Sequence, residues 1–182
     1  MKLKIFVFMI LVVIFSMPVI AQTNDISFSI GVPFISISRD FDQSVDNDQF
    51  IEFGLNLNIM FFKNSDFGYY INMYGLFNLD INDDNGIVDL YFGIIPGIGY
   101  RKIINDNLSF FGGIGPAIIY DIIDLGETDI TRFGIGIGGT LEIRLQLYKN
   151  FNFAGGVLID SNFSNKMSRN INIHPYIGFS WN

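Results

Sequence analysis

The feature that most constrains this chain is the strict alternation of apolar residues with small or polar ones over long segments. In Phe133–Tyr148, FGIGIGGTLEIRLQLY, one set of positions holds Phe, Ile, Leu and a single Gly. The other set holds Gly, Thr, Glu, Arg, Gln and Tyr. A period of two places successive side chains on opposite faces of a β-strand. This segment therefore predicts a long strand with one continuous apolar face.

Eight segments of the chain follow the same pattern and predict eight strands. They are Ile26–Ser38, Phe50–Phe62, Phe67–Leu79, Ile87–Tyr100, Leu108–Tyr120, Phe133–Tyr148, Phe151–Ile159 and Ile171–Trp181. In the first segment the alternation changes phase after Pro33, which predicts a bulge. Segments joined by short turns must be antiparallel neighbours, so the chain predicts an up-and-down antiparallel sheet.

The apolar faces of the eight segments carry no Asp, Glu, Lys or Arg, and this decides which face meets water. A soluble barrel such as a lipocalin would turn the Gly, Asn and Ser face outward, where it would be nearly free of charge, unlike ordinary protein surfaces. Its bulky aromatic side chains would also overfill a narrow lumen. With the faces reversed, the apolar side chains meet lipid and a closed sheet pairs every backbone group. We therefore predict an all-β, eight-stranded antiparallel transmembrane β-barrel.

The N-terminus predicts export. Residues 1–21 contain Lys2 and Lys4, an apolar run and Val19-Ile20-Ala21, the arrangement of a cleavable signal peptide. The apolar run is short for a helix that spans a bilayer. We predict cleavage after Ala21 and one barrel domain over residues 22–182.

The connections alternate in length, which predicts short turns at one end of the barrel and long loops at the other. The short ones are Lys63–Asp66, Arg101–Asn107 and Lys149–Asn150, and the longer ones are Ser38–Gln49, Asp80–Gly86, Asp121–Asp129 and Asp160–Asn170. The longer loops are acidic. Their acidic residues are Asp40, Asp42, Asp46, Asp48, Asp80, Asp83, Asp84, Asp121, Asp124, Glu127, Asp129 and Asp160, beside Arg39, Lys166 and Arg169. Such loops predict a solvated rim that is a candidate for binding divalent cations or a surface ligand.

Two groups of side chains follow from the alternation. The inward positions predict a lumenal polar network of Asn56, Asn58, Asp89, Glu142, Arg144, Gln146, His174 and Tyr176. Glu142 and Arg144 would pair directly or through neighbouring strands, with Asp89 and His174 as candidate partners. Aromatic residues near the short turns predict an interfacial girdle of Phe61, Tyr69, Tyr100, Phe110, Phe151 and Trp181.

The signal peptide, the eight alternating strands, the loop asymmetry and the C-terminal strand resemble those of small outer-membrane β-barrel proteins of the OmpA-transmembrane-domain and OmpX type. The resemblance covers the whole mature chain and is architectural. It implies a bacterial outer-membrane location with both mature termini in the periplasm. It also implies contact of Ile171–Trp181 with the barrel-assembly machinery, although Asn182 follows the terminal aromatic residue.

Recognisable chemistry is sparse. The glycines of Gly134–Gly139 lie within one strand, so they do not form a phosphate loop, and the segment Asp80–Gly86 does not match an EF-hand. Lipid A deacylases that resemble this architecture use a His with a Ser two residues later. His174 is the only histidine in this chain, and Tyr176 occupies the position two residues later. A net charge of −7 argues against nucleic acid. No cofactor and no metal are predicted.

The sequence therefore favours a monomeric, non-enzymatic outer-membrane barrel that contacts outer-membrane lipid. Its role would be envelope integrity or surface interaction through the acidic loops. One alternative is a narrow channel for small solutes or ions, because many inward positions are glycine. A second alternative is an outer-membrane lipid-modifying enzyme that uses His174.

Overall fold

The computed structural model describes residues 26–33, 36–39, 48–50, 52–62, 65–79, 88–124, 129–163 and 171–181. The predicted signal peptide, 1–21, lies outside these residues. So do most of the predicted acidic loop positions, together with Lys166 and Arg169. In the described part, no helix is long and apolar enough to cross a membrane.

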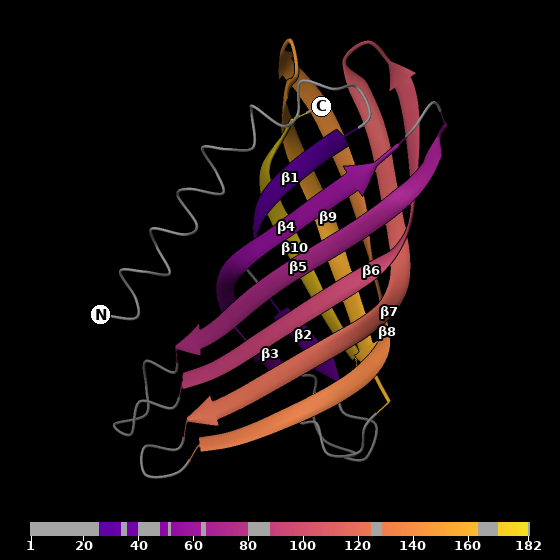
Figure 1. The fold of residues 1–182 in the computed structure, drawn as a ribbon. Coiled ribbons are helices and arrows are strands. Elements are labelled where there is room, and N and C mark those ends of the chain that lie inside the picture. Colours follow the sequence, from indigo (N-terminus) through magenta and orange to yellow (C-terminus); the bar gives the residue numbers. More distant parts are fainter. Residues whose placement is uncertain are drawn as a thin grey trace, which may run out of the picture.

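Ten strand elements form one closed sheet (Figure 1). They are β1 (Ile26–Pro33), β2 (Ser36–Arg39), β3 (Asp48–Phe50), β4 (Glu52–Phe61), β5 (Phe67–Leu79), β6 (Val88–Asn105), β7 (Leu108–Asp124), β8 (Asp129–Tyr148), β9 (Phe151–Asn162) and β10 (Ile171–Trp181). Each strand from β4 to β10 pairs with the next, and β1 pairs with both β4 and β10. Because β2 continues β1 and β3 leads into β4, the barrel has eight antiparallel strands. The predicted fold is confirmed.

The first strand is interrupted where its alternation changes phase. On β1, Pro33 is paired with Tyr176 of β10, whereas on β2 Ile37 is paired with Ile173. The first strand therefore advances by one residue more than its partner over this interval. An extra residue of this kind is the defining property of a β-bulge, and the predicted irregularity after Pro33 is confirmed.

Strands β6, β7 and β8 are longer than the alternation alone predicted. The connection predicted over Asp121–Asp129 shrinks to residues 125–128, and the one over Arg101–Asn107 shrinks to Asp106–Asn107. Strands in a closed barrel are staggered, so pairing can continue beyond the level at which a neighbouring hairpin turns. The predicted long loop between β7 and β8 is therefore wrong.

Two residues predicted for the acidic rim are in fact inside the barrel. Asp121 on β7 and Asp160 on β9 are fully buried. Both continue the inward set of their strands, as Ala117 and Leu158 do. Asp48, Asp124 and Asp129 also fall within strands, although their side chains lie outside the described set. The acidic rim is correspondingly smaller than predicted.

Glycine is required where β6 and β7 come close together. A Cβ atom on Gly115 would lie 1.9 Å from the carbonyl oxygen of Pro96, and one on Gly97 would lie 2.0 Å from that of Ile114. Both obstacles are backbone atoms, which cannot rotate away. Pro96 and Pro116 are next to these glycines in the sequence, and neither proline has an N–H group to donate to the hydrogen bonds between the strands. The two inward glycines thus allow the close approach of the strands.

We expect Gly115→Ala to lower the free energy of unfolding by roughly 1–3 kcal/mol, the usual cost of overpacking. Gly155→Ala is the matched control, because a Cβ on Gly155 would meet no atom within 4 Å. Urea unfolding in lipid vesicles measures both changes. Equal effects of the two substitutions would contradict the steric explanation.

Candidate functional site

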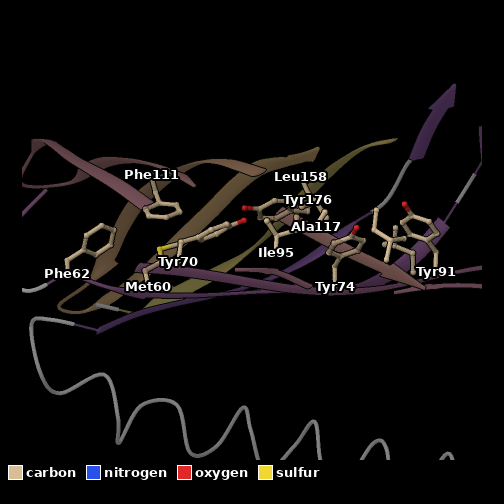
Figure 2. Close-up of a cluster of buried hydrophobic side chains, with 12 residues drawn as sticks. Met60, Phe62, Tyr70, Tyr74, Tyr91, Ile95, Phe111, Ala117, Leu158 and Tyr176 are labelled. Carbon is tan, nitrogen blue, oxygen red and sulfur yellow. The ribbon is translucent and has the colours of Figure 1, made fainter. Parts of the chain in front are cut away.

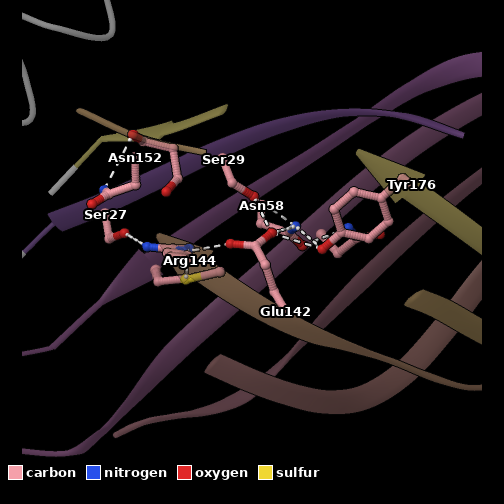
Figure 3. Close-up of polar contacts among 10 residues, drawn as sticks. Ser27, Ser29, Asn58, Glu142, Arg144, Asn152 and Tyr176 are labelled. Carbon is pink, nitrogen blue, oxygen red and sulfur yellow. Dashed lines mark hydrogen bonds and ion pairs between the residues drawn. The ribbon is translucent and has the colours of Figure 1, made fainter. Parts of the chain in front are cut away.

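The lumen holds a buried carboxylate with four hydrogen-bond donors (Figure 3). Glu142 on β8 is 1 % exposed. Its Oε2 accepts hydrogen bonds from Ser29 Oγ at 2.6 Å, Tyr176 OH at 2.7 Å and Asn58 Nδ2 at 3.2 Å. Its Oε1 accepts one from Arg144 Nε at 2.5 Å. We call these five residues the Glu142 cluster, which draws on β1, β4, β8 and β10.

Arg144 has a partner for each part of its guanidinium group. Beyond the ion pair with Glu142, its Nη1 donates to Ser27 Oγ, and its Nη2 lies 3.0 Å from Met60 Sδ. The guanidinium carbon is 5.4 Å from the centre of the Phe111 ring. Arg144 is 2 % exposed, so its charge is compensated inside the barrel rather than by solvent.

An amide ladder extends the Glu142 cluster across β4 and β5. Asn72 Nδ2 donates to Asn58 Oδ1 at 2.7 Å and also to Asn56 Oδ1. Tyr70 on β5 also donates a hydrogen bond from its OH to Thr140 Oγ1 on β8, at 2.7 Å. These bonds join β4, β5 and β8 through the lumen rather than through the sheet.

A second buried carboxylate lies further along the lumen. Asp160 Oδ1 accepts from Tyr91 OH at 2.7 Å and Asn172 Nδ2 at 2.8 Å, and its Oδ2 accepts from Tyr74 OH at 2.9 Å. His174 Nε2 is 3.3 Å from Oδ2. All five side chains are at least 96 % buried, since Tyr74 is the most exposed at 4 %. We call them the Asp160 cluster.

Apolar side chains separate the two clusters. Figure 2 shows Ile95, Ala117 and Leu158 between Tyr70 and Tyr176 on one side and Tyr74 and Tyr91 on the other. Ile95, Ala117 and Leu158 are all fully buried. Along its axis the lumen is therefore polar, then apolar, then polar again.

The structure brings five of the eight predicted lumenal residues together and places two others elsewhere. Asn58, Glu142, Arg144 and Tyr176 meet in the Glu142 cluster, and Asn56 adjoins it. The ion pair of Glu142 with Arg144 is direct. His174 contacts Asp160 instead, and Gln146 donates to the backbone oxygen of Lys149 near a turn. The side chain of Asp89 lies outside the described set.

The sequence pattern as far as Ile159 did not predict that Asp160, the acceptor of the second cluster, lies in the lumen. The predicted strand ends at Ile159, which places Asp160 in a loop. The alternation that holds Asn152, Ala154 and Leu158 inward continues through Asp160 to Asn162, all of which are buried. That continued periodicity was the available signal.

The predicted girdle residues lie at the short-turn end of the barrel. Phe61 and Tyr69 are exposed, and Tyr100, Phe110, Phe151 and Trp181 are partly exposed. The Phe151 ring centre is 5.5 Å from that of Trp181.

A second aromatic row, which was not predicted, lies toward the loop end. Phe92, Tyr120 and Phe133 are exposed cross-strand partners on β6, β7 and β8. The Tyr120 and Phe133 ring centres are 5.1 Å apart. The outer surface therefore has aromatic side chains near both ends.

A closed antiparallel barrel with a polar, filled interior and an apolar exterior has the architecture of small outer-membrane β-barrels. Solved structures of that kind are similar to this chain. Neisserial surface protein A is 12 % identical with a TM-score of 0.64, over 87 % of this chain and 97 % of its own. Ail, the attachment invasion locus protein of Yersinia pestis, is 16 % identical with a TM-score of 0.60, over 86 % and 97 %.

OprG from Pseudomonas aeruginosa is a more distant structural neighbour, 13 % identical with a TM-score of 0.51, over 85 % of this chain and 94 % of its own. No family model and no curated relative matches the sequence. These likenesses concern the fold. In the described residues, no group of three or more His, Cys, Asp or Glu side chains could hold a metal ion.

Proposed function

We propose that this chain is an integral barrel of the bacterial outer membrane, with a non-enzymatic role in envelope integrity or surface interaction. The observation that carries the proposal is the inverted distribution of polarity. Ionic groups such as Glu142 and Arg144 are buried, whereas large apolar side chains such as Ile98 and Ile114 are 65 % and 63 % exposed. Soluble monomers rarely expose apolar patches of this extent. Hydrocarbon is the solvent that suits such an exterior.

The spacing of the two aromatic rows supports a membrane location. Phe110 and Tyr120 lie on the outer face of β7, ten residues apart. At about 3.4 Å per residue and a strand tilt of about 40°, the rows are roughly 26 Å apart along the barrel axis. An apolar band of about 25 Å is typical of outer-membrane barrels. The two rows would then lie at the two interfaces.

Three further parts of the proposal rest on the sequence. Residues 1–21 would direct export and be removed, which leaves residues 22–182 as the mature barrel with periplasmic termini. The strand Ile171–Trp181 would be recognised by the barrel-assembly machinery. We also propose a monomer, because β1 pairs with both β4 and β10 and thereby closes the sheet.

The acidic loops would provide the surface for interaction. The Ail protein has a structure in complex with the heparin analogue sucrose octasulfate. A polyanion of that type does not suit this chain, whose predicted loop positions include Asp40, Asp42, Asp83 and Asp84. By charge complementarity we propose basic surface ligands or divalent cations as partners.

The filled lumen favours this role over a channel. Water or ions would have to pass the Glu142 cluster, the apolar layer of Ile95, Ala117 and Leu158, and the Asp160 cluster. An eight-stranded barrel has an interior just wide enough for its own side chains. Passage would therefore require several buried hydrogen bonds to break together.

The burial of His174 favours this role over a lipid-modifying enzyme. His174 is fully buried and lies beside Asp160, Tyr74 and Tyr91 inside the barrel. A membrane lipid on the outer surface has no contact with it. A general base must come within hydrogen-bond reach of the proton that it removes.

We expect the refolded chain to migrate differently on gels before and after boiling, and to give no conductance steps in planar bilayers. The first result reflects a closed, detergent-resistant barrel, and the second reflects the filled lumen. Uniform migration would contradict the barrel in lipid, whereas regular conductance steps would favour the channel.

A deletion strain tests the role itself. Unchanged envelope sensitivity and unchanged surface binding of basic ligands would contradict it.

A further inference from the structure

The outer surface of the barrel has an apolar groove across five neighbouring strands, β5 to β9. Its volume is about 590 Å³. Its lining includes the outward side chains of Tyr100, Phe110, Ile114 and Leu141 and the two outward glycines Gly112 and Gly139. The groove interrupts the large apolar side chains on the outer faces of β6, β7 and β8.

The groove exists because Gly112 and Gly139 lack side chains in a row of large ones. At Gly139, packing explains the glycine, since a Cβ would lie 2.5 Å from the backbone oxygen of Gly113. At Gly112 it does not. A Cβ there would come no closer than 3.3 Å to an atom, Cδ2 of Leu141, which is the end of a flexible side chain. The hollow at Gly112 is therefore not imposed by the fold.

The dimensions of the groove suit one acyl chain. From β5 to β9 it crosses four strand spacings of about 4.8 Å each, or roughly 19 Å measured around the curved outer surface. One leaflet of a bilayer has a hydrocarbon thickness of about 15 Å. Because barrel strands are tilted, a groove that runs across them also rises through the leaflet. A chain inclined to the membrane normal would fit along it.

A cation lies at the short-turn end of the groove. Lys102 is exposed on β6, two residues beyond Tyr100 on the same outward face. Its backbone partner is Phe110, which lines the groove. Arg101 and Lys149 lie at the same end of the barrel. A hydrophobic groove with an exposed lysine two residues beyond its lining residue Tyr100 is complementary to an apolar chain that ends at an anion.

We propose that this groove binds one acyl chain of an anionic glycerophospholipid from the periplasmic leaflet, with Lys102 facing the phosphate. Gly112 provides the depth, and the paired rings of Phe67 and Tyr100, 4.9 Å apart, border the end nearest the headgroup. The proposal rests on the membrane location and orientation proposed above. It makes this barrel a selective binder of the lipid that surrounds it.

The test uses the full chain refolded into phosphatidylcholine nanodiscs that contain a trace of photoreactive phospholipid. The reactive diazirine is on the acyl chain, and the headgroup is phosphatidylglycerol in one arm and phosphatidylcholine in the other. After irradiation, mass spectrometry maps the adducts along the strands. We expect adducts to concentrate on residues 110–114 and 137–141, about fivefold more with phosphatidylglycerol than with phosphatidylcholine.

Two pairs of variants separate the groove from general contact with lipid. Gly112→Leu fills the groove and should abolish the concentration of adducts, whereas Gly155→Leu, on the outward face of β9 with no atom within 4 Å of an added Cβ, should preserve it. Lys102→Ala should remove the preference for phosphatidylglycerol. Lys149→Asn should retain that preference and suits the positive φ of 45° at this turn.

The outcomes are distinct. Adducts spread evenly over all outward strands, equal labelling by the two lipids, or an unchanged pattern in both Gly112→Leu and Lys102→Ala would each overturn the inference. These results count only for protein whose gel migration changes on boiling. Failure of the unmodified chain to insert into the nanodiscs would instead overturn the proposed membrane location.

Discussion

Glu142→Leu is expected to lower the free energy of unfolding by about 3–5 kcal/mol, the usual cost of breaking a buried ion pair from one side. Arg144 would keep a buried charge without its carboxylate. Ser29, Asn58 and Tyr176 would each lose the acceptor on which their donors converge. Urea unfolding of the refolded protein in lipid vesicles, followed by gel migration, measures the loss.

Two companion variants test the cause. Glu142→Leu combined with Arg144→Met should recover much of the stability, because replacing both members of a buried pair by apolar residues is often neutral or stabilising. Gln146→Leu, on the same strand and only partly buried, should change stability by less than about 1 kcal/mol. If Glu142→Leu costs no more than Gln146→Leu, the cluster does not hold the barrel together.

Ile114→Arg is expected to cost about 2–4 kcal/mol, the penalty for a cation on the lipid face near the midplane. Ile114 is 63 % exposed and lies between Phe110 and Tyr120 on the outer face of β7. In water, a change at such an exposed position would usually alter stability by only about 0.5 kcal/mol. Equilibrium unfolding in vesicles gives the value.

The matched control for Ile114→Arg is Ile104→Arg. Ile104 is 59 % exposed and lies next to the β6–β7 turn, where the penalty should fall to about 0–1 kcal/mol. A difference between these two variants measures depth in the bilayer rather than exposure. Equal costs at the two positions would contradict a hydrocarbon environment around Ile114.

The strands and their faces were predictable because a period of two holds within each strand from β5 to β10. The inward orientation of Glu142 and Arg144 followed from the same rule. Strand ends were less predictable, since pairing beyond Tyr120 and Ile159 depends on the stagger of neighbouring strands. The prediction that Asp121 and Asp160 lie in loops is wrong for that reason.

The alternation does not predict which groups from other strands contact the buried charges. Alternation predicts whether a side chain points into the lumen. It does not predict the position of that side chain along the barrel axis relative to strands on the other side of the lumen. Glu142 contacts Ser29 across the lumen, although 113 positions separate them in the sequence. His174 contacts Asp160 rather than Glu142 because of the register of β9 against β10. The register of neighbouring strands and the stagger of the barrel together determine which side chains come into contact.

The composition of the Glu142 cluster has a consequence for how the barrel assembles. Its carboxylate on β8 is satisfied by Ser29 on β1 and Tyr176 on β10, the two strands that pair to close the sheet. An open sheet that lacked this seam would leave the carboxylate with part of its donors missing in a medium of low dielectric constant. Closure of the ring therefore completes the hydrogen bonding of this carboxylate, whose counter-charge Arg144 lies on the same strand. We therefore expect half-closed intermediates in lipid to be scarce, because they lack the hydrogen bonds from Ser29 and Tyr176 to Glu142.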